Sequence, residues 1–397
     1  MITVEEAAQQ IEAAMPPRPV QQVTVAQAGL QILAEPVLAE RDQPPFDRVM
    51  MDGIAIAHAA LGTGTTRFRR TGIQAAGTEP KALADRGDCI EVMTGAALPA
   101  GCDCIVPVEQ VSMDDTYASI SDPDGIKARQ FIHPRGSDYR SGRTILSPGT
   151  RLGAAEMAVL ASSGSESVSV ACQPAIEVLA VGDELVDPGA ELASWQIRRS
   201  NDFAIETLLH GHQLTTTSRN KLPDNADVLE REIGDALKRC DVLVLTGGVS
   251  MGRYDYIPRI MQLLEVEILL HRVAQAPGKP MWVGRRGGTM VFALPGNPVS
   301  ALVCARRYVV PAIESSMGIR PAGETAVLGA PIENATRLTR FVPVISERQE
   351  TGTTLMPRPT NTSGDFHALA GTAGFVALAP GARVPAGATA EFWRWHR

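Results

Sequence analysis

Three short apolar runs, each followed by a glycine-rich or polar turn, constrain the fold more than any other feature. They are Ala175-Ile-Glu-Val-Leu-Ala-Val181, Asp241-Val-Leu-Val-Leu-Thr246 and Thr289-Met-Val-Phe-Ala-Leu294. Continuous apolar runs that alternate with helical periodicity are typical of buried parallel strands. The pattern predicts a doubly wound, largely parallel α/β sheet. Because such sheets bind ligands beyond the carboxyl ends of their strands, the turns after these runs are the predicted binding region.

The segments on either side of this sheet have a different texture. Residues 44–135 contain short β-like runs separated by frequent turn signals, which predicts a small β domain. Similar runs return from about residue 320, which predicts a C-terminal β-barrel or sandwich. Residues 1–40 and 150–165 have helical stretches that we expect to pack together as one discontinuous domain.

Charge and composition exclude several classes of protein. The formal net charge is −7, so no global basic field is available to bind nucleic acid. The acidic N-terminus lacks the pattern of a signal peptide, and no apolar run reaches the roughly 20 residues of a membrane span. The six cysteines are scattered, which predicts free thiols that are buried or half-buried. We therefore expect a soluble cytoplasmic protein with no membrane partner.

The turn after the second apolar run is a candidate anion site. In Gly247-Gly-Val-Ser-Met-Gly252 the backbone N–H groups can surround an anion without obstruction by a Cβ atom. The turn is neither a Walker loop nor a dinucleotide fingerprint. Asp255, beyond this turn, and the Asp183-Glu184 pair, beyond the first run, are solvated carboxylates or ligands of a divalent metal such as Mg²⁺. The residues alone leave both interpretations open.

Two further turns could take part in binding. Pro277-Gly-Lys279-Pro280 presents one of only five lysines among 37 basic residues, and lysine suits an oxyanion or phosphate. Pro295-Gly-Asn297-Pro298 can cap the helix that follows it. A surface lysine and an ordinary helix cap would explain these turns equally well.

Taken in order, these segments resemble the molybdenum insertase family, which includes bacterial MoeA-type proteins and the E domain of gephyrin. The resemblance covers nearly the whole chain and rests on the ordered set rather than on any single motif. Its segments are Ala26–Ala34, Pro44-Pro-Phe-Asp47, Met51-Asp-Gly53, Met93-Thr-Gly-Ala96, Gly136-Ser-Asp138, Gly182-Asp-Glu-Leu185, Thr246-Gly-Gly-Val-Ser250 with Asp255, Pro277-Gly-Lys-Pro280, Pro295-Gly-Asn-Pro-Val-Ser300 and Thr362-Ser-Gly364.

The resemblance implies an elongated homodimer with four domains in each subunit. Residues 1–43 and 136–172 would form a discontinuous N-terminal linker and dimerisation domain, with an inserted β domain at 44–135. A molybdopterin-binding α/β domain at 173–318 and a C-terminal β domain at 319–397 would follow.

The resemblance also implies a reaction and its participants. The family inserts molybdenum from molybdate into adenylylated molybdopterin and releases AMP, with Mg²⁺ as cofactor. The enzyme that adenylylates molybdopterin and the molybdoenzymes that receive the product are the protein partners it suggests. The active site would lie between the α/β and C-terminal domains of one subunit and the inserted domain of the other.

Carried over position by position, the resemblance assigns the site residues. Asp52 would reach in from the partner subunit, and Glu184 and Asp255 would bind the metal. The glycine turn and Lys279 would hold phosphates or the oxyanion, and Ser363 would complete the pocket. The catalytic set is Asp52, Asp138, Glu184, Asp224 and Asp255; the substrate-binding set is Thr246, Gly247, Gly248, Ser250, Arg272, Lys279, Pro295, Gly296, Asn297 and Ser363.

Two positions depart from the family pattern. Ala276 stands where the family commonly has lysine, and Arg272 replaces a second lysine while keeping its charge. Loss of one cation that faces an oxyanion costs about 1.5–3 kcal/mol. A catalytically weakened paralogue that binds molybdopterin or a protein as a scaffold is therefore the alternative function. A third interpretation is a pterin-adenylylating enzyme that resembles only the α/β domain. The sequence does not distinguish molybdate from tungstate.

Overall fold

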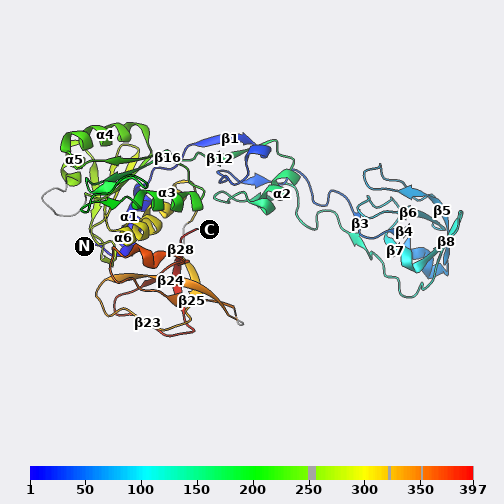
Figure 1. The fold of residues 1–397 in the computed structure, drawn as a ribbon. Coiled ribbons are helices and arrows are strands. Elements are labelled where there is room, and N and C mark those ends of the chain that lie inside the picture. The colour runs from blue at the N-terminus through cyan, green and yellow to red at the C-terminus, as the bar shows by residue number, and fades with distance from the viewer. Residues whose placement is uncertain (249–255, 321–322, 350–351, 397) are drawn as a thin grey trace.

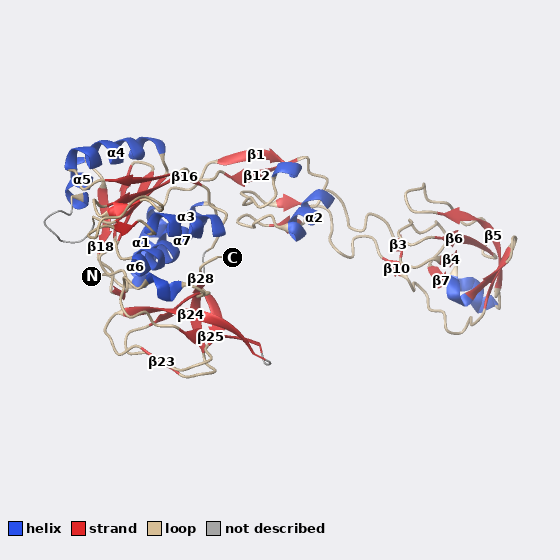
Figure 2. Cartoon of the chain, viewed as in Figure 1, coloured by secondary structure: helices blue, strands red, loops and turns tan. Residues whose placement is uncertain are grey.

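The computed structural model describes residues 1–248, 256–320, 323–349 and 352–396. Figure 1 shows an elongated molecule, with the α/β sheet and the C-terminal strands at one end and the inserted β unit at the other. The segment that joins them contains β1, β12 and α2 (Figure 2). Within the described residues, no helix is both long and apolar enough to span a membrane.

The α/β unit is built on a six-stranded sheet in the order β16-β13-β17-β21-β20-β18. The first four strands are parallel to one another, and β20 runs antiparallel to both of its neighbours, β21 and β18. The doubly wound, largely parallel sheet predicted from the sequence is therefore confirmed. Its strands are β13 (Ile176–Val181), β16 (Thr216–Leu222), β17 (Val242–Thr246), β18 (Glu267–His271), β20 (Trp282–Arg286) and β21 (Thr289–Leu294).

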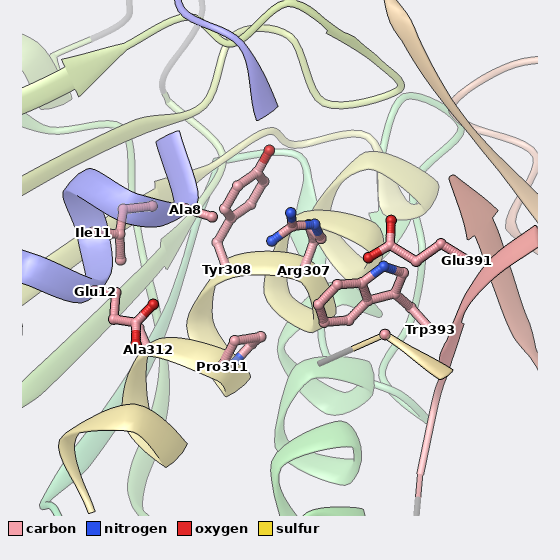
Figure 3. Close-up of a pocket in the computed structure, with 10 residues that line it drawn as sticks. Ala8, Ile11, Glu12, Arg307, Tyr308, Pro311, Ala312, Glu391 and Trp393 are labelled. Atoms are coloured by element: carbon pink, nitrogen blue, oxygen red, sulfur yellow. The ribbon is translucent and has the colours of Figure 1, made fainter. Parts of the chain in front are cut away.

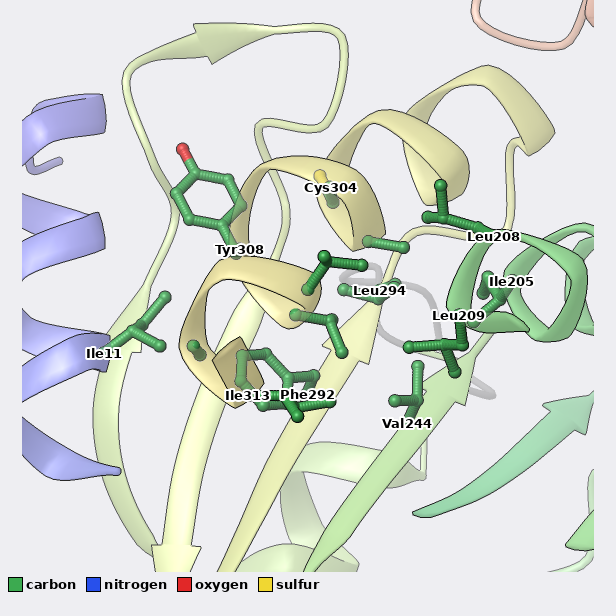
Figure 4. Packing of buried hydrophobic residues seen from close by; sticks show 14 of the residues in the cluster. Ile11, Ile205, Leu208, Leu209, Val244, Phe292, Leu294, Cys304, Tyr308 and Ile313 are labelled. Atoms are coloured by element: carbon green, nitrogen blue, oxygen red, sulfur yellow. The ribbon is translucent and has the colours of Figure 1, made fainter. Parts of the chain in front are cut away.

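Helices cover both faces of this sheet. One face packs against α1, α3, α6 and α7 in one buried cluster, whose members include Ile11, Ile205, Val244, Phe292 and Ile313 (Figure 4). The other face packs against α4 and α5. The helices are α1 (Val4–Ala14), α3 (Asn201–Gly211), α4 (Ala226–Arg239), α5 (Ile257–Leu263), α6 (Pro298–Cys304) and α7 (Val310–Ser316), with a π-helical turn η4 (Ala305–Val309) between the last two.

The segments before and after the inserted unit pair with each other. β1 (Val20–Thr24) lies antiparallel to β12 (Ser167–Ala171), and β2 (Val37–Leu38) to β11 (Thr144–Leu146), with α2 (Ala154–Ser162) beside them. These segments share a small core that includes Leu33, Leu160 and Val170. However, α1 packs into the core of the α/β unit, although the predicted linker domain of residues 1–43 included it. The domain boundaries stay predictions.

The inserted unit carries its own sheet, in the order β7-β4-β6-β5-β9-β8. A short ribbon of β3 (Arg48–Val49) and β10 (Ile132–His133) lies where the chain enters and leaves this unit. The sheet strands are β4 (Gly53–Ile56), β5 (Arg67–Gln74), β6 (Asp88–Val92), β7 (Cys104–Pro107), β8 (Val111–Met113) and β9 (Tyr117–Ile120).

The C-terminal unit is a β structure that shares a strand with the α/β unit. β19 (Gln275–Ala276), which comes from the α/β part of the chain, pairs in parallel with β24. The multidomain α/β and β fold class is thus confirmed, with the two units joined through one sheet. The other strands are β22 (Glu324–Val327), β23 (Ile332–Glu333), β24 (Thr339–Gln349), β25 (Gly352–Pro357), β26 (Gly374–Leu378), β27 (Arg383–Val384) and β28 (Thr389–Arg394).

The six cysteines are free, and only Cys172 is partly exposed. Burial raises the pKa of the thiols of Cys89, Cys102, Cys104, Cys240 and Cys304 to about 12. Since the thiolate is the reactive form, we expect a thiol reagent at pH 8 to modify about one thiol per native chain, at Cys172. Mass spectrometry after brief labelling checks this result, and labelling of Cys304 in the native state would contradict it.

Arg18 ties the segment after α1 to the edge of the α/β sheet. Its guanidinium lies 2.8 and 2.9 Å from the two carboxylate oxygens of Asp241, which also accepts the Ala175 N–H. Burial raises the pKa of Asp241, but these donors outweigh that effect and hold the pKa below its usual range. A lowered folded-state pKa stabilises the fold above the ordinary pKa of about 4, and this contribution is lost as the pH falls through the folded-state value.

We therefore expect Asp241→Asn to flatten the acid limb of the unfolding free energy. Urea unfolding measured at several pH values between about pH 4 and pH 2 checks this expectation. If the variant and the wild type lose stability in parallel over that range, Asp241 is not the group responsible.

Candidate functional site

The register of the parallel strands brings the three predicted turns together. Ala180 lies beside Thr246, and Thr246 lies beside Leu294, so β13, β17 and β21 end at one edge of the sheet. The turns that follow line an open cleft of about 1000 Å³. The Gly247–Gly248 turn, Glu184 and the Pro295-Gly-Asn297 turn thus share one site. Its lining includes the predicted residues Glu184, Asp224, Thr246, Gly247, Gly248, Pro295, Gly296 and Asn297.

The glycine turn is held against the sheet in a conformation that requires glycine. Gly247 and Gly248 have φ values of +94° and +66°. A Cβ atom on Gly247 would lie 2.3 Å from the carbonyl oxygen of Val181. The turn therefore crosses directly over the end of β13, with no room for a side chain.

Asn201, the first residue of α3, connects two of the turns, and the sequence did not single it out. Its side-chain nitrogen donates to Thr246 Oγ1 at 2.8 Å and to the Gly296 carbonyl at 2.7 Å. Its side-chain oxygen is buried and has no partner in the described structure. The only local signal is the position of Asn201 at the start of a helix, which also suits an ordinary helix terminus.

A buried ion-pair network supports the wall beside Asn201. Asp202 is fully buried, and its Oδ2 atom lies 3.1 Å from Arg199 and 3.0 Å from Arg219. Arg199 also pairs with Asp187 at 3.1 Å, and Arg219 pairs with Glu206 at 2.8 Å. The network fixes the 187–199 segment to the start of α3. Arg198, Arg199 and Asp202 all line the cleft, and the sequence pointed to none of them.

The acidic residues divide into two groups. Asp183 accepts the backbone N–H of Asp224 at 3.1 Å, and Asp224 accepts that of Asp183 at 3.2 Å. Glu184 is exposed beside them. Asp52 and Asp138 do not lie at the cleft of this chain. Asp52 directly precedes β4 of the inserted unit, and Asp138 lies 2.8 Å from His133 of β10. Figure 2 shows β4 and β10 at the far end of the molecule from the α/β sheet.

The Asp52 carboxylate is held in a fixed position. The backbone N–H and the hydroxyl of Thr94 donate to it at 2.7 and 2.8 Å. These two hydrogen bonds hold the pKa of Asp52 below its usual range, so the group is ionised at neutral pH. An approach of Asp52 to the cleft of a second subunit stays a prediction.

The donor chemistry at the rim fits Mg²⁺. Carboxylate oxygens are its usual protein ligands, and it is commonly held by one or two carboxylates together with ligand phosphates. Glu184 and Asp224 provide such oxygens at the cleft. In the part of the chain that the structure describes, no three His, Cys, Asp or Glu side chains form a cluster that could hold a metal alone. Asp255 and Ser250 lie outside the described residues.

A smaller cavity of about 310 Å³ lies where the C-terminal unit meets the α/β unit. Ser363 lines it and accepts a hydrogen bond from the Asn297 side chain at 2.7 Å, which links this cavity to the cleft. Ala276 lines the same cavity, and Arg340 is its partner in the β19–β24 register. Arg340 was missed because arginine is common in this chain and no local motif marks the position. Lys279 and Arg272 are not among the described residues that line either cavity.

Another cavity, of about 340 Å³, lies between α1, the π-helical turn and β28 (Figure 3). Its lining includes Arg307, which is largely buried and stacks over the ring of Trp393 at 4.5 Å. This stacking accounts for the buried cation, since an aromatic face attracts a guanidinium.

Two family models match this chain. Residues 2–164 match the family model "MoeA N-terminal region (domain I and II)", and residues 177–315 match "Probable molybdopterin binding domain". A Synechocystis protein named molybdopterin molybdenumtransferase is 37% identical over 92% of this chain and 92% of its own length. The chain belongs to the MoeA family.

Other members and structures of the MoeA family agree. A Staphylococcus aureus protein of the same name is 31% identical over 96% of this chain and 92% of its own length. The crystal structure of a MoeA protein from Pyrococcus horikoshii covers 100% of both chains with a TM-score of 0.80 and 26% identity. These matches extend across all the units of the fold, so the alternative of a chain that resembles a pterin-adenylylating enzyme in its α/β part alone is not favoured.

Proposed function

We propose that this chain is a molybdopterin molybdenumtransferase that inserts molybdenum from molybdate into adenylylated molybdopterin and releases AMP. We assign it Mg²⁺ as cofactor, a homodimeric state and a cytoplasmic location. The observation that carries the proposal is the match, over 92% of the chain, to a relative that bears this name. The cleft supports it, because a glycine turn, helix-terminal asparagines and carboxylates gather at one edge of the α/β sheet.

In this proposal the large cleft binds adenylylated molybdopterin and the smaller cavity binds molybdate. The N–H groups of the Gly247–Gly248 turn would bind phosphate oxygens, as exposed backbone N–H groups do in anion-binding turns. Molybdate would occupy the smaller cavity, beside Arg340 and Ser363. Arginine suits a tetrahedral oxyanion because its planar fork donates two parallel hydrogen bonds.

The carboxylates would act at the phosphates of adenylylated molybdopterin by holding Mg²⁺. Glu184, together with Asp224 or Asp255, would hold Mg²⁺, whose chemistry when bound is to neutralise charge on phosphate oxygens. A molybdate oxygen would attack the adenylyl phosphorus and break the phosphoanhydride bond. This step releases the phosphate of molybdopterin and leaves molybdate joined to AMP. The two dithiol sulfurs would then replace two oxygens on molybdenum, of which one leaves as part of AMP and the other leaves as water with the two thiol protons.

The test is a single-turnover assay with purified protein, adenylylated molybdopterin, Mg²⁺ and molybdate. AMP release and reconstitution of a cofactor-free molybdoenzyme would be followed, with Asp255→Ala alongside. We expect AMP release that depends on molybdate and is lost in the variant. Tight pterin binding without AMP release would contradict the molybdate proposal, and tungstate would then be tried.

The second candidate function is a weakened paralogue that acts as a scaffold. Ala276 favours it, because this position carries no cation. Arg340, the neighbour of Ala276 on the adjacent strand, weighs against it by supplying a cation to the same cavity. Molybdate-dependent AMP release that falls in Arg340→Ala would decide for the enzyme.

A shared active site makes a distinctive prediction for mixed dimers. Asp52→Ala and Asp255→Ala subunits are each expected to be inactive alone. After subunit exchange in an equal mixture, half of the dimers contain both variants, and each such dimer has one intact site. We therefore expect about a quarter of the wild-type AMP release to return. If no activity returns after exchange has been verified by native mass spectrometry, Asp52 does not act across subunits.

A further inference from the structure

The large cleft is lined by exposed apolar side chains from two units of the fold. Leu192 and Ile197 line it from the 187–199 segment of the α/β unit, and Phe366 lines it from the C-terminal unit. Ile197 is 56% exposed and Phe366 is 41% exposed. Large apolar side chains that stay exposed in a ligand cavity mark an apolar subsite.

Other residues that line the same cleft are polar. They include the Gly247–Gly248 turn, the Asn201 side chain and Asn297. The cleft thus combines groups that suit phosphate with apolar side chains that suit a flat ring. A ligand that fits both must carry an anionic group at one end and an extended ring at the other.

The apolar residues from both units belong to ordered local structure. Phe366 belongs to the η5 turn (Phe366–Leu369) and stacks on His367, with ring centroids 4.4 Å apart. Ile197 lies in β15 (Ile197–Arg198), which pairs with β14 (Leu185–Val186). The next residue, Arg199, is fixed by its ion pairs with Asp187 and Asp202. The apolar residues are therefore preorganised before a ligand enters.

We propose that Leu192, Ile197 and Phe366 form a ring clamp that stacks the fused heteroaromatic ring of the substrate. This inference rests on the proposed function, which supplies a substrate with two such rings, adenine and pterin. Stacking on an aromatic side chain is tolerant of ring identity because every such ring has a π-face. The clamp would orient the ring end while the glycine turn holds the phosphate end.

The experiment measures binding by calorimetry, without turnover. The probes are AMP, 6-hydroxymethylpterin and ribose 5-phosphate, which has the phosphate but no ring. The variants are Phe366→Ala and Ile197→Ala. Ile268→Ala is the matched control, because Ile268 is 55% exposed on β18 and does not line the cleft. Circular dichroism checks that each variant is folded.

We expect Phe366→Ala to weaken binding of at least one ring compound about fivefold or more, in line with the usual contribution of stacking. Ile197→Ala should weaken the same compound, and Ile268→Ala should not. Ribose 5-phosphate should bind equally to all four proteins. A loss confined to AMP identifies adenine as the clamped ring, and a loss confined to the pterin identifies the pterin.

Equal binding of both ring compounds to wild type and to the two clamp variants would overturn the ring clamp and leave the proposed function standing. If the wild type binds neither ring compound, the proposed function itself fails. Trp195 offers a second readout in the same segment. It is 78% exposed, whereas the other three tryptophans are buried, so ring binding at the clamp should change its fluorescence.

Discussion

Asp202→Ala is expected to lower the free energy of unfolding by about 3 kcal/mol, because it leaves two guanidinium groups without their shared buried partner. Asp202 is fully buried, and the side chains of Arg199 and Arg219 are only 10% and 21% exposed. Neither cation can recover full hydration once the carboxylate is gone. Urea unfolding followed by circular dichroism measures the loss.

The same substitution should also affect ligand binding in the cleft. Arg199 holds the 187–199 segment through Asp187 and Asp202, and residues of that segment line the cleft. AMP binding should therefore weaken in the folded variant.

Asp235→Ala is the matched control for this prediction. Asp235 pairs with Lys238 at 2.9 Å on α4, and both side chains are at least half exposed. Exposed pairs of this kind contribute little, so a change within about 0.5 kcal/mol is expected. Equal losses in the two variants would show that the buried network does not stabilise the fold more than a surface pair does.

Gly247→Ala is expected to lower the free energy of unfolding by a similar amount, because the backbone is strained and the added Cβ atom collides with a neighbouring strand. An alanine at a φ of +94° is strained, and its Cβ would lie 2.3 Å from the Val181 carbonyl oxygen. Relief requires movement of the turn away from β13. We expect a loss of about 3 kcal/mol in unfolding free energy. AMP release should fall about a hundredfold, since small displacements of binding groups reduce the rate steeply.

Gly288→Ala separates this effect from a general cost of losing glycine. Gly288 lies in the exposed turn between β20 and β21, and a Cβ there would meet no heavy atom within 4 Å. Stability and AMP release should both stay near the wild-type values. Normal AMP release in Gly247→Ala would mean that this turn does not hold the phosphate.

Local patterns in the sequence were sufficient to predict the α/β sheet and the turns at its edge. Apolar runs such as Val242–Thr246 form strands that are buried on both faces, because burial of their side chains is favourable on either face of the sheet. A glycine after such a run indicates a tight turn. Because parallel strands end at one edge, the meeting of Glu184, Gly247 and Asn297 followed from the pattern without any tertiary information. The family resemblance added Asp52, Asp138 and Asp224 to the candidate carboxylates and supplied the domain boundaries.

The tertiary structure decided the contacts between segments that lie far apart in the chain. Asn201 meets Thr246 and Gly296, Arg340 lies beside Ala276, and Phe366 lines the same cleft as the 187–199 segment. No local motif marks these side chains as site residues, because the partners of each lie far away in the sequence. The packing of α1 is a further example. Its apolar face predicted that the helix packs against a hydrophobic core, but only the fold showed that this core belongs to the α/β unit. Sequence therefore determined which elements form and where their turns meet, whereas packing between distant segments determined the walls of the site.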